Sequence, residues 1–241
     1  MKAEGIIKEL VLLDGKPSVR IRCDPALIPA PGQYVLAYAI GSDVSPVLRS
    51  SVLADAVFSA KIFTDGFLAA LPVPISWMIG TPLHLRGPLG HGFLVPKDAR
   101  RVALVAFEVQ KTRAGDSLTR LSALINIVLK QEASIVLVCR TPPDDLPPQI
   151  EVQPLKALMD ICDWADYIAM DTERESLPEL KKMFGEGNLL KGRKDAQILI
   201  HTPMPCGAIA ECGVCAVVSH HRQLLVCKDG PVFDLKDLLD E

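Results

Sequence analysis

The sequence predicts a mixed α/β and all-β fold: an N-terminal antiparallel β-barrel, a Rossmann-like parallel α/β domain and a small C-terminal cysteine-rich segment. Three observations support this. Short β segments separated by Pro and Gly fill the chain to about residue 97, strands then alternate with helices, and four of the 7 cysteines follow residue 205. We therefore expect domains over residues 1–97, 98–202 and 203–241.

The first section contains five β segments rich in Val, Ile, Leu and Tyr. They are "GIIKELVLL", "PSVRIRC", "GQYVLAYAI", "SVLADAVFSAKIF" and "TPLHLRG". Turn sequences such as "DGKP", "PAPG" and "GSDVSP" lie between them. Short strands at this spacing are typical of a small antiparallel barrel.

The second section has a different periodicity. "RVALVAF" and "ASIVLVCR" are continuous apolar runs of strand length, and "DSLTRLSALINIVLKQ" between them carries apolar residues at helical spacing. "IEVQPLKALMDICDWA" predicts a strand that leads into a helix, "ESLPELKKMFGEG" a helix with a Gly stop, and "DAQILIHTP" a last strand. The intervening "MDTERES", with Asp171, Glu173 and Glu175, is expected to be a solvated loop and helix start.

Composition excludes several classes of function. A net charge of -3 provides no basic field for phosphates, so nucleic acid is not an expected partner. No apolar run reaches the length of a membrane span, and Lys8 and Glu9 interrupt the first apolar stretch before it resembles a signal peptide. We expect a cytoplasmic protein, whose clustered cysteines are better interpreted as metal ligands than as disulfides.

The C-terminal cysteines have a spacing that suits a metal centre. Five, two and eleven residues separate Cys206, Cys212, Cys215 and Cys227 in turn. The two-residue spacing favours Cys212 and Cys215 as a pair at one metal centre, and a zinc ribbon would repeat such a pair. The observed order is a single cysteine, then a pair, then a distant single cysteine. This order is closer to the plant-type 2Fe-2S pattern than to a zinc ribbon. Zinc and plain burial of four thiols remain alternatives.

A resemblance extends this interpretation. "CGAIAECGVC" followed by "CKDGPVFD" resembles the cluster segment of dihydroorotate dehydrogenase electron transfer subunits, in the ferredoxin reductase superfamily. "PGQYV", Arg49 and "GPLGHGF" follow the family's order, so the resemblance spans nearly the whole chain. It implies a barrel that binds FAD, an NAD-type domain, and a 2Fe-2S cluster on Cys206, Cys212, Cys215 and Cys227. In such a complex the cluster relays electrons to a catalytic partner subunit in pyrimidine biosynthesis.

The flavin residues implied by the resemblance are Arg49, Ser50, Ser51, Gly87 and Gly90. The chain departs from the family pattern at two places. In the flavin motif, Val52 stands where the family has a hydroxyl-bearing residue. In the cluster segment, five residues rather than four separate the first two cysteines.

The nicotinamide motif is missing. Phe107 and Glu108 stand where the family has glycines after its first Rossmann strand, and a carboxylate there repels a diphosphate. Independent oxidation of NAD(H) is therefore not expected.

Two hypotheses follow. The first is an electron transfer subunit with a 2Fe-2S cluster and FAD, an oxidoreductase component rather than a self-sufficient enzyme. The alternative is a degenerate, nucleotide-free relative that keeps the cluster or a zinc ion as a structural element of a larger complex.

Overall fold

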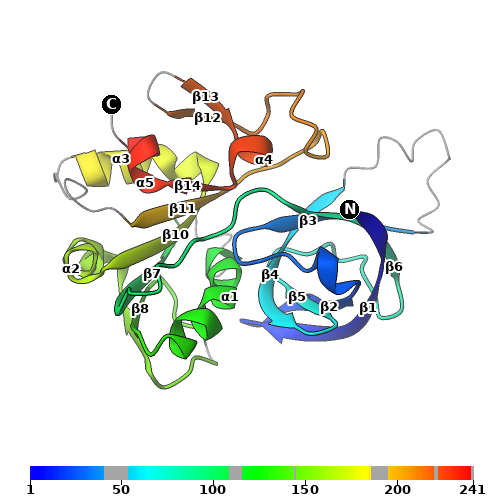
Figure 1. The fold of residues 1–241 in the computed structure, drawn as a ribbon, viewed down its shortest axis with the longest axis horizontal. Helices are drawn as coiled ribbons and strands as arrows, with labels where there is room; N and C mark the ends of the chain where they lie inside the picture. The colour runs from blue at the N-terminus through cyan, green and yellow to red at the C-terminus, as the bar shows by residue number, and fades with distance from the viewer. Residues whose placement is uncertain (41–53, 109–115, 144, 186–194, 220–221, 240–241) are drawn as a thin grey trace.

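A computed structural model describes residues 1–40, 54–108, 116–143, 145–185, 195–219 and 222–239. The barrel and the α/β sheet lie beside each other, and the cysteine-rich segment lies above the region where they meet (Figure 1). No helix among these residues is long and apolar enough to cross a membrane.

The N-terminal section is a closed barrel with the strand order β1-β2-β5-β4-β3-β6. All its neighbouring strands pair antiparallel. This confirms the predicted barrel. The strands are β1 (Lys2–Leu13), β2 (Lys16–Arg22), β3 (Tyr34–Ala39), β4 (Asp55–Phe63), β5 (Gly66–Ala69) and β6 (Pro82–Leu89), with a 3-10 turn at Pro25–Leu27. The sequence did not indicate β5, which is only 4 residues long.

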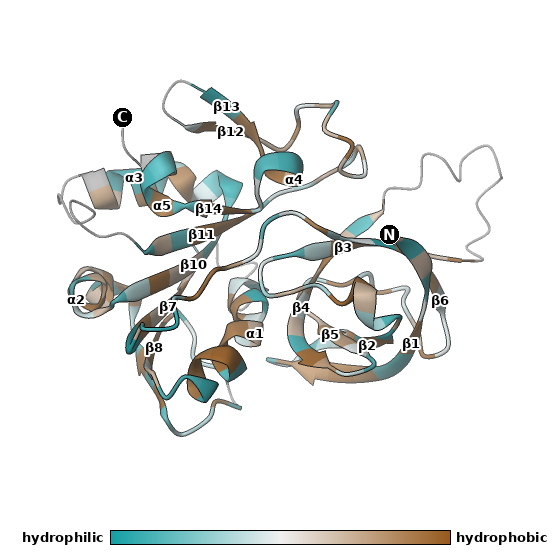
Figure 2. Ribbon diagram, in the orientation of Figure 1, coloured by the Kyte–Doolittle hydropathy of each residue, from teal (hydrophilic) through white to brown (hydrophobic). Residues whose placement is uncertain are grey.

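The second section is a six-stranded sheet in the order β14-β11-β10-β7-β8-β9. Its core strands are parallel, and their apolar residues are buried between helices on both faces (Figure 2). Its elements are β7 (Arg101–Phe107), α1 (Asp116–Lys130), β8 (Ser134–Val138), β9 (Ile150–Gln153), α2 (Leu158–Trp164), β10 (Tyr167–Glu173), α3 (Leu177–Gly185) and β11 (Ala196–His201), with 3-10 turns at Leu155–Ala157 and Arg174–Ser176. The strand order reverses between β7 and β10, which is the usual nucleotide crevice of such a sheet.

The expectation of a solvated loop over "MDTERES" is wrong. Asp171 and Glu173 lie in β10, and the Asp171 side chain is fully buried. Arg120 of α1 explains the burial, because its guanidinium forms two hydrogen bonds to Asp171, at 2.7 and 2.9 Å. A buried carboxylate is tolerated only with such a partner.

The C-terminal segment adds to the second sheet. It contains β12 (Ala216–Ser219), β13 (Arg222–Leu225), α4 (Val226–Asp229), β14 (Val232–Asp234) and α5 (Leu235–Leu239). Strands β12 and β13 form a two-stranded antiparallel sheet, while β14 pairs antiparallel with β11. The segment is thus fixed to the α/β sheet at its C-terminal end.

Three sequence motifs meet at one place, which we call the junction: residues 31–34, 90–93 and 230–232. The His91 N–H donates to the Gly230 carbonyl at 2.7 Å, and the Phe93 N–H donates to the Pro31 carbonyl at 2.9 Å. A Cβ atom on Gly90 would lie 2.4 Å from the Pro231 ring. The junction therefore ties the barrel to the C-terminal segment through backbone contacts.

We expect Gly90→Ala to destabilise the protein by about 1–3 kcal/mol more than Gly15→Ala. Both glycines have a φ of 74°. They therefore share the cost of a left-handed side chain, roughly 1–2 kcal/mol. A Cβ on Gly15 meets nothing within 4 Å, so that variant isolates the contact with Pro231. Urea unfolding of both variants measures the difference, and equal losses would show that Gly90 is needed only for its backbone conformation.

Candidate metal centre

The four C-terminal cysteines come from two local structures. Cys206 and Cys212 lie in the irregular segment 206–215, which we call the cysteine loop, and Cys215 ends this loop just before β12. Cys227 lies in α4. Cys215 and Cys227 are buried, Cys206 is half-buried and Cys212 is exposed. One side of the site, with Cys215 and Cys227, is therefore buried, and the other, with Cys212, lies at the protein surface.

The cysteine side chains meet as two pairs. Cys206 and Cys212 are hydrogen-bonded to each other, and so are Cys215 and Cys227. This pairing differs from the Cys212–Cys215 pair that the two-residue spacing favours. In the part of the chain that the structure describes, no group of three or more histidine, cysteine or carboxylate side chains gathers as a site for one ion.

The backbone of the cysteine loop points its N–H groups at sulfur. Ile209, Ala210 and Glu211 each donate a backbone hydrogen bond to Cys206. This requires a folded-back backbone, with a positive φ at Gly207 (60°), Ala208 (56°) and Ala210 (64°). Left-handed alanines are uncommon, and a succession of such N–H groups forms a concave site for an anion. The loop is therefore built to surround negatively charged sulfur.

The protonation of the thiols follows from these contacts. Burial raises the pKa of Cys206, but the hydrogen bond with Cys212 and the three backbone N–H groups outweigh it and lower the pKa to about 6. Burial, followed by the contact with Cys215, raises the pKa of Cys227 to about 12. Cys206 is therefore a thiolate at neutral pH, which is the form that binds metal.

Three hydrogen bonds fix the site to the rest of the protein, and a fourth joins the cysteine loop to α4. Arg86 of β6 donates to the Gly207 carbonyl, and Arg174 donates to the Val214 carbonyl. The buried Tyr34 hydroxyl donates to the Cys227 carbonyl at 3.0 Å, and the Val226 N–H donates to the Cys215 carbonyl at 3.1 Å. The barrel and the α/β domain thus each hold one end of the cysteine loop, and Tyr34 joins the junction to Cys227.

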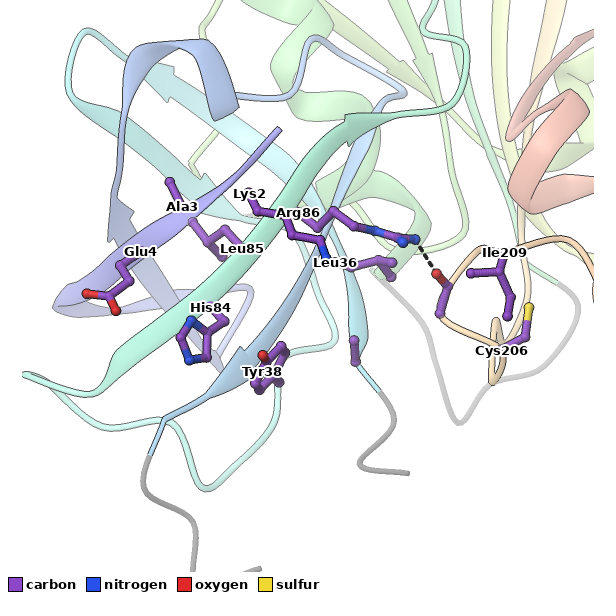
Figure 3. A pocket seen from close by; sticks show the side chains of 12 residues that line it. Lys2, Ala3, Glu4, Leu36, Tyr38, His84, Leu85, Arg86, Cys206 and Ile209 are labelled. Carbon is purple, nitrogen blue, oxygen red and sulfur yellow. Dashed lines mark hydrogen bonds between the residues drawn. The ribbon is translucent and has the colours of Figure 1, made fainter. Parts of the chain in front are cut away.

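A cavity of about 500 Å³ lies between the barrel and the cysteine loop. Figure 3 shows Arg86 reaching across it toward the loop, with Cys206 and Ile209 on the far side. Tyr38 and His84 form an aromatic pair in its wall, with ring centroids 4.9 Å apart. Its lining comes from β1, β3, β6, Ala54 and the loop: Lys2, Ala3, Glu4, Leu36, Tyr38, Ala54, His84, Leu85, Arg86, Cys206, Gly207 and Ile209.

The residues predicted to contact a flavin have mixed outcomes. Arg49, Ser50 and Ser51 lie outside the described residues. Gly87 packs inside the barrel, where a Cβ would lie 2.7 Å from the Val35 side chain, and Gly90 packs in the junction. Packing therefore accounts for both glycines, and their contact with a flavin stays a prediction.

The chain's own side chains form polar contacts at the ends of β7 and β10, where the strand order reverses. The Glu108 carboxylate accepts a hydrogen bond from the Ser117 N–H at 3.0 Å, so it caps the start of α1. Arg120, bound to Asp171, also reaches Glu173 at 3.3 Å. Because nearby carboxylates outweigh the effect of burial, the pKa of Arg120 lies above its usual range and the guanidinium is charged.

His201 belongs to this polar network rather than to the cysteines. Its Nδ1 lies 2.9 Å from a Glu173 carboxylate oxygen, and its ring packs edge-on against Phe58 of the barrel.

Sequence reasoning missed Tyr34, Arg86 and Arg174 as parts of the site. Tyr34 lies within "PGQYV", so its motif was identified without its contact to Cys227. Arg86 directly precedes "GPLG". Arg174 lies in "MDTERES", and no feature of that stretch pointed to the cysteine loop.

The chain has a ferredoxin reductase-like fold, and its C-terminal segment resembles an iron-sulfur binding domain. Residues 201–239 match the family model described as the iron-sulfur cluster binding domain of dihydroorotate dehydrogenase B. The match confirms the resemblance inferred from the sequence for this C-terminal segment. A search among curated proteins finds no significant match.

Solved structures share the fold at low sequence identity. A structure of the NADH-dependent reduced ferredoxin-NADP oxidoreductase matches with 16% identity and a TM-score of 0.69, over 98% of this chain and 90% of that chain. The ferredoxin reductase in carbazole 1,9a-dioxygenase matches with 17% identity and a TM-score of 0.54, over 81% and 65%. A variant of ferredoxin-NADP+ reductase from Plasmodium falciparum matches with 9% identity and a TM-score of 0.57, over 83% and 96%.

In the metal-free protein at pH 7, we expect iodoacetamide to alkylate Cys206 at least about tenfold faster than Cys23. Both side chains are half-buried, but burial, followed by the charges of Asp24 and Asp65, raises the pKa of Cys23 to about 11. Peptide mass mapping over time measures the two rates. Equal rates would contradict the loop geometry at Cys206.

Proposed function

We propose that this chain is the electron transfer subunit of an oxidoreductase complex, with a 2Fe-2S cluster on Cys206, Cys212, Cys215 and Cys227. The observation that carries the proposal is the meeting of these cysteines as two pairs. A 2Fe-2S cluster takes two thiolates at each iron, and the paired arrangement suits this need. When bound, the cluster carries one electron at a time.

The cysteine loop supplies the remaining requirements of such a cluster. Its N–H groups donate to sulfur, which stabilises added negative charge and raises the reduction potential. Gly207 and Gly213 have no atom within 4 Å of a Cβ position, so the backbone has open space around it. The buried Cys215–Cys227 side is shielded from water, whereas Cys212 is exposed.

We place the flavin of the complex, FAD, in the cavity beside the cysteine loop. About 500 Å³ lies within the usual range for a small-molecule site, about 300–1,000 Å³. Tyr38 and His84 offer aromatic surface, and Ala54, which follows the predicted flavin residues Arg49, Ser50 and Ser51 by a few positions, also lines the cavity. Because Cys206 also lines this cavity, electrons have a short path between a flavin bound there and the cysteines.

Electrons leave toward a catalytic partner subunit at the Cys212 side in this proposal. Exposed apolar side chains follow Cys212 in the chain: Val214 is 43% exposed, and Val218 of β12 is 66% exposed. Exposed apolar groups next to a redox centre suit a protein partner that excludes water from the path. The family match suggests a dihydroorotate dehydrogenase, and hence pyrimidine biosynthesis, as the setting.

The start of α1 is unsuited to NAD(H), so in this proposal the electrons come from a source other than NAD(H) bound to this chain. A dinucleotide needs the helix N–H groups at the start of α1, and Glu108 already accepts the one from Ser117. The second candidate is a nucleotide-free relative that carries the cluster, or a zinc ion, as a structural element, and the Glu108 cap fits both candidates. The two candidates differ in whether the cavity beside the loop binds flavin.

Anaerobically purified protein should contain about two irons and two acid-labile sulfides per chain, with the visible absorption of an oxidised 2Fe-2S centre. Cys227→Ser should lose most of the iron, since it removes a buried thiolate, while Cys162→Ser, also at a buried cysteine, should keep it. Metal analysis and absorption spectra measure this. A colourless protein with one zinc per chain would contradict the proposal.

Protein reconstituted with FAD should take up flavin but should not be reduced by NADH. Glu108 repels the diphosphate at the start of α1, so no hydride donor binds there. Absorption spectra under anaerobic conditions measure this, with dithionite as the control that reduces both centres. Bleaching by NADH within seconds would refute the closed crevice, and failure to take up FAD would favour the second candidate.

A further inference from the structure

Arg86 lies at the boundary between the cavity and the cysteine loop. It projects from the outer face of β6, and its guanidinium donates to the Gly207 carbonyl, next to Cys206 (Figure 3). The side chain is half-buried, and its Nε has no hydrogen-bond partner among the described residues and no contact with solvent. The charged group is therefore held partly out of water beside the site.

Arg86 lies close to the cysteine set. Its hydrogen bond is to the residue that follows Cys206, and Arg86 and Cys206 line the same cavity. No carboxylate in the described part of the chain forms an ion pair with Arg86, so its positive charge is not cancelled locally.

We propose that Arg86 sets the reduction potential of the cluster, a role that rests on the proposed function of the four cysteines. Reduction adds one negative charge to the iron-sulfur centre. A cation close to that centre and partly shielded from water stabilises the reduced form more than the oxidised form. Arg86 therefore raises the potential and favours electron flow from the cavity onto the cluster.

Arg174 provides a matched comparison. Like Arg86, it donates to a carbonyl of the cysteine loop, that of Val214. Unlike Arg86, it is paired with a carboxylate, Glu175, at 3.1 Å. Removing Arg174 therefore removes a loop anchor while its charge is already largely compensated. A difference between the two positions reports the uncompensated charge rather than the hydrogen bond.

The test is a redox titration of the cluster in the full chain, followed by its electron paramagnetic resonance signal, for wild type, Arg86→Gln, Arg86→Lys and Arg174→Gln. Arg86→Gln keeps a hydrogen-bond donor and loses the charge. We expect it to lower the ratio of reduced to oxidised cluster about tenfold at a fixed potential, equivalent to about 59 mV for one electron. Arg86→Lys and Arg174→Gln should stay within about threefold of wild type.

The other outcomes are equally informative. The proposal would be overturned if the ratio of reduced to oxidised cluster in Arg86→Gln stayed within about twofold of wild type at the same potential. An equal change of this ratio in Arg174→Gln would also overturn it. So would loss of iron in Arg86→Gln, because holding the loop in place would then be the whole role of Arg86. Wild-type protein without iron and sulfide would instead refute the proposed function itself, so the two failures are distinguishable.

Discussion

The hydrogen bond from His91 to Gly230, with the packing of Gly90 on Pro231, is the contact on which the arrangement of the cysteines depends. It joins the end of the barrel to the turn that follows α4, and α4 carries Cys227. Tyr34, from the neighbouring strand of the barrel, then holds the Cys227 carbonyl directly. Apart from the Tyr34 hydroxyl, these contacts are made by backbone atoms, a glycine and a proline ring, so the position of Cys227 is defined with little side-chain freedom.

The other half of the site is held differently. The cysteine loop has no regular secondary structure, and it is fixed by Arg86 from one domain and Arg174 from the other. Its left-handed residues carry a conformational cost, of order 1–3 kcal/mol each. Contacts of its N–H groups with anionic sulfur offset this cost, and a bound cluster would add to them. The site thus combines a rigid buried pair with a loop whose geometry is supported by the charge it surrounds.

Much of the fold follows from local patterns in the sequence, because alternating and helical apolar spacing reports directly on burial. The barrel and the strands that flank α1 were predictable for this reason. Strand β10 was not, since Asp171 is buried by a pair with Arg120, and these residues are 51 positions apart. A polar stretch gives no local sign that a distant guanidinium neutralises it.

The candidate site was predictable in its residue types but not in its geometry. The spacing of the four cysteines indicated a cluster, whereas their pairing depends on left-handed backbone at Ala208 and Ala210, which alanine does not signal. The motifs "PGQYV", "GPLGHGF" and "DGPVF" were each identifiable, but their meeting at the junction is a property of the tertiary structure. The same holds for Glu108, whose role as a cap for α1 needs the folded crevice.

The central claim is that the junction forms independently of the cluster and positions Cys227 for it. Amide hydrogen exchange of metal-free and cluster-loaded protein tests this most directly. The account predicts that the His91 and Phe93 amides, which donate at 2.7 and 2.9 Å, are equally protected in both forms. The Ile209 and Ala210 amides, which donate to Cys206, should gain further protection when the cluster is bound. If the His91 and Phe93 amides of the metal-free protein exchange as fast as those of the cysteine loop, the junction does not organise the site.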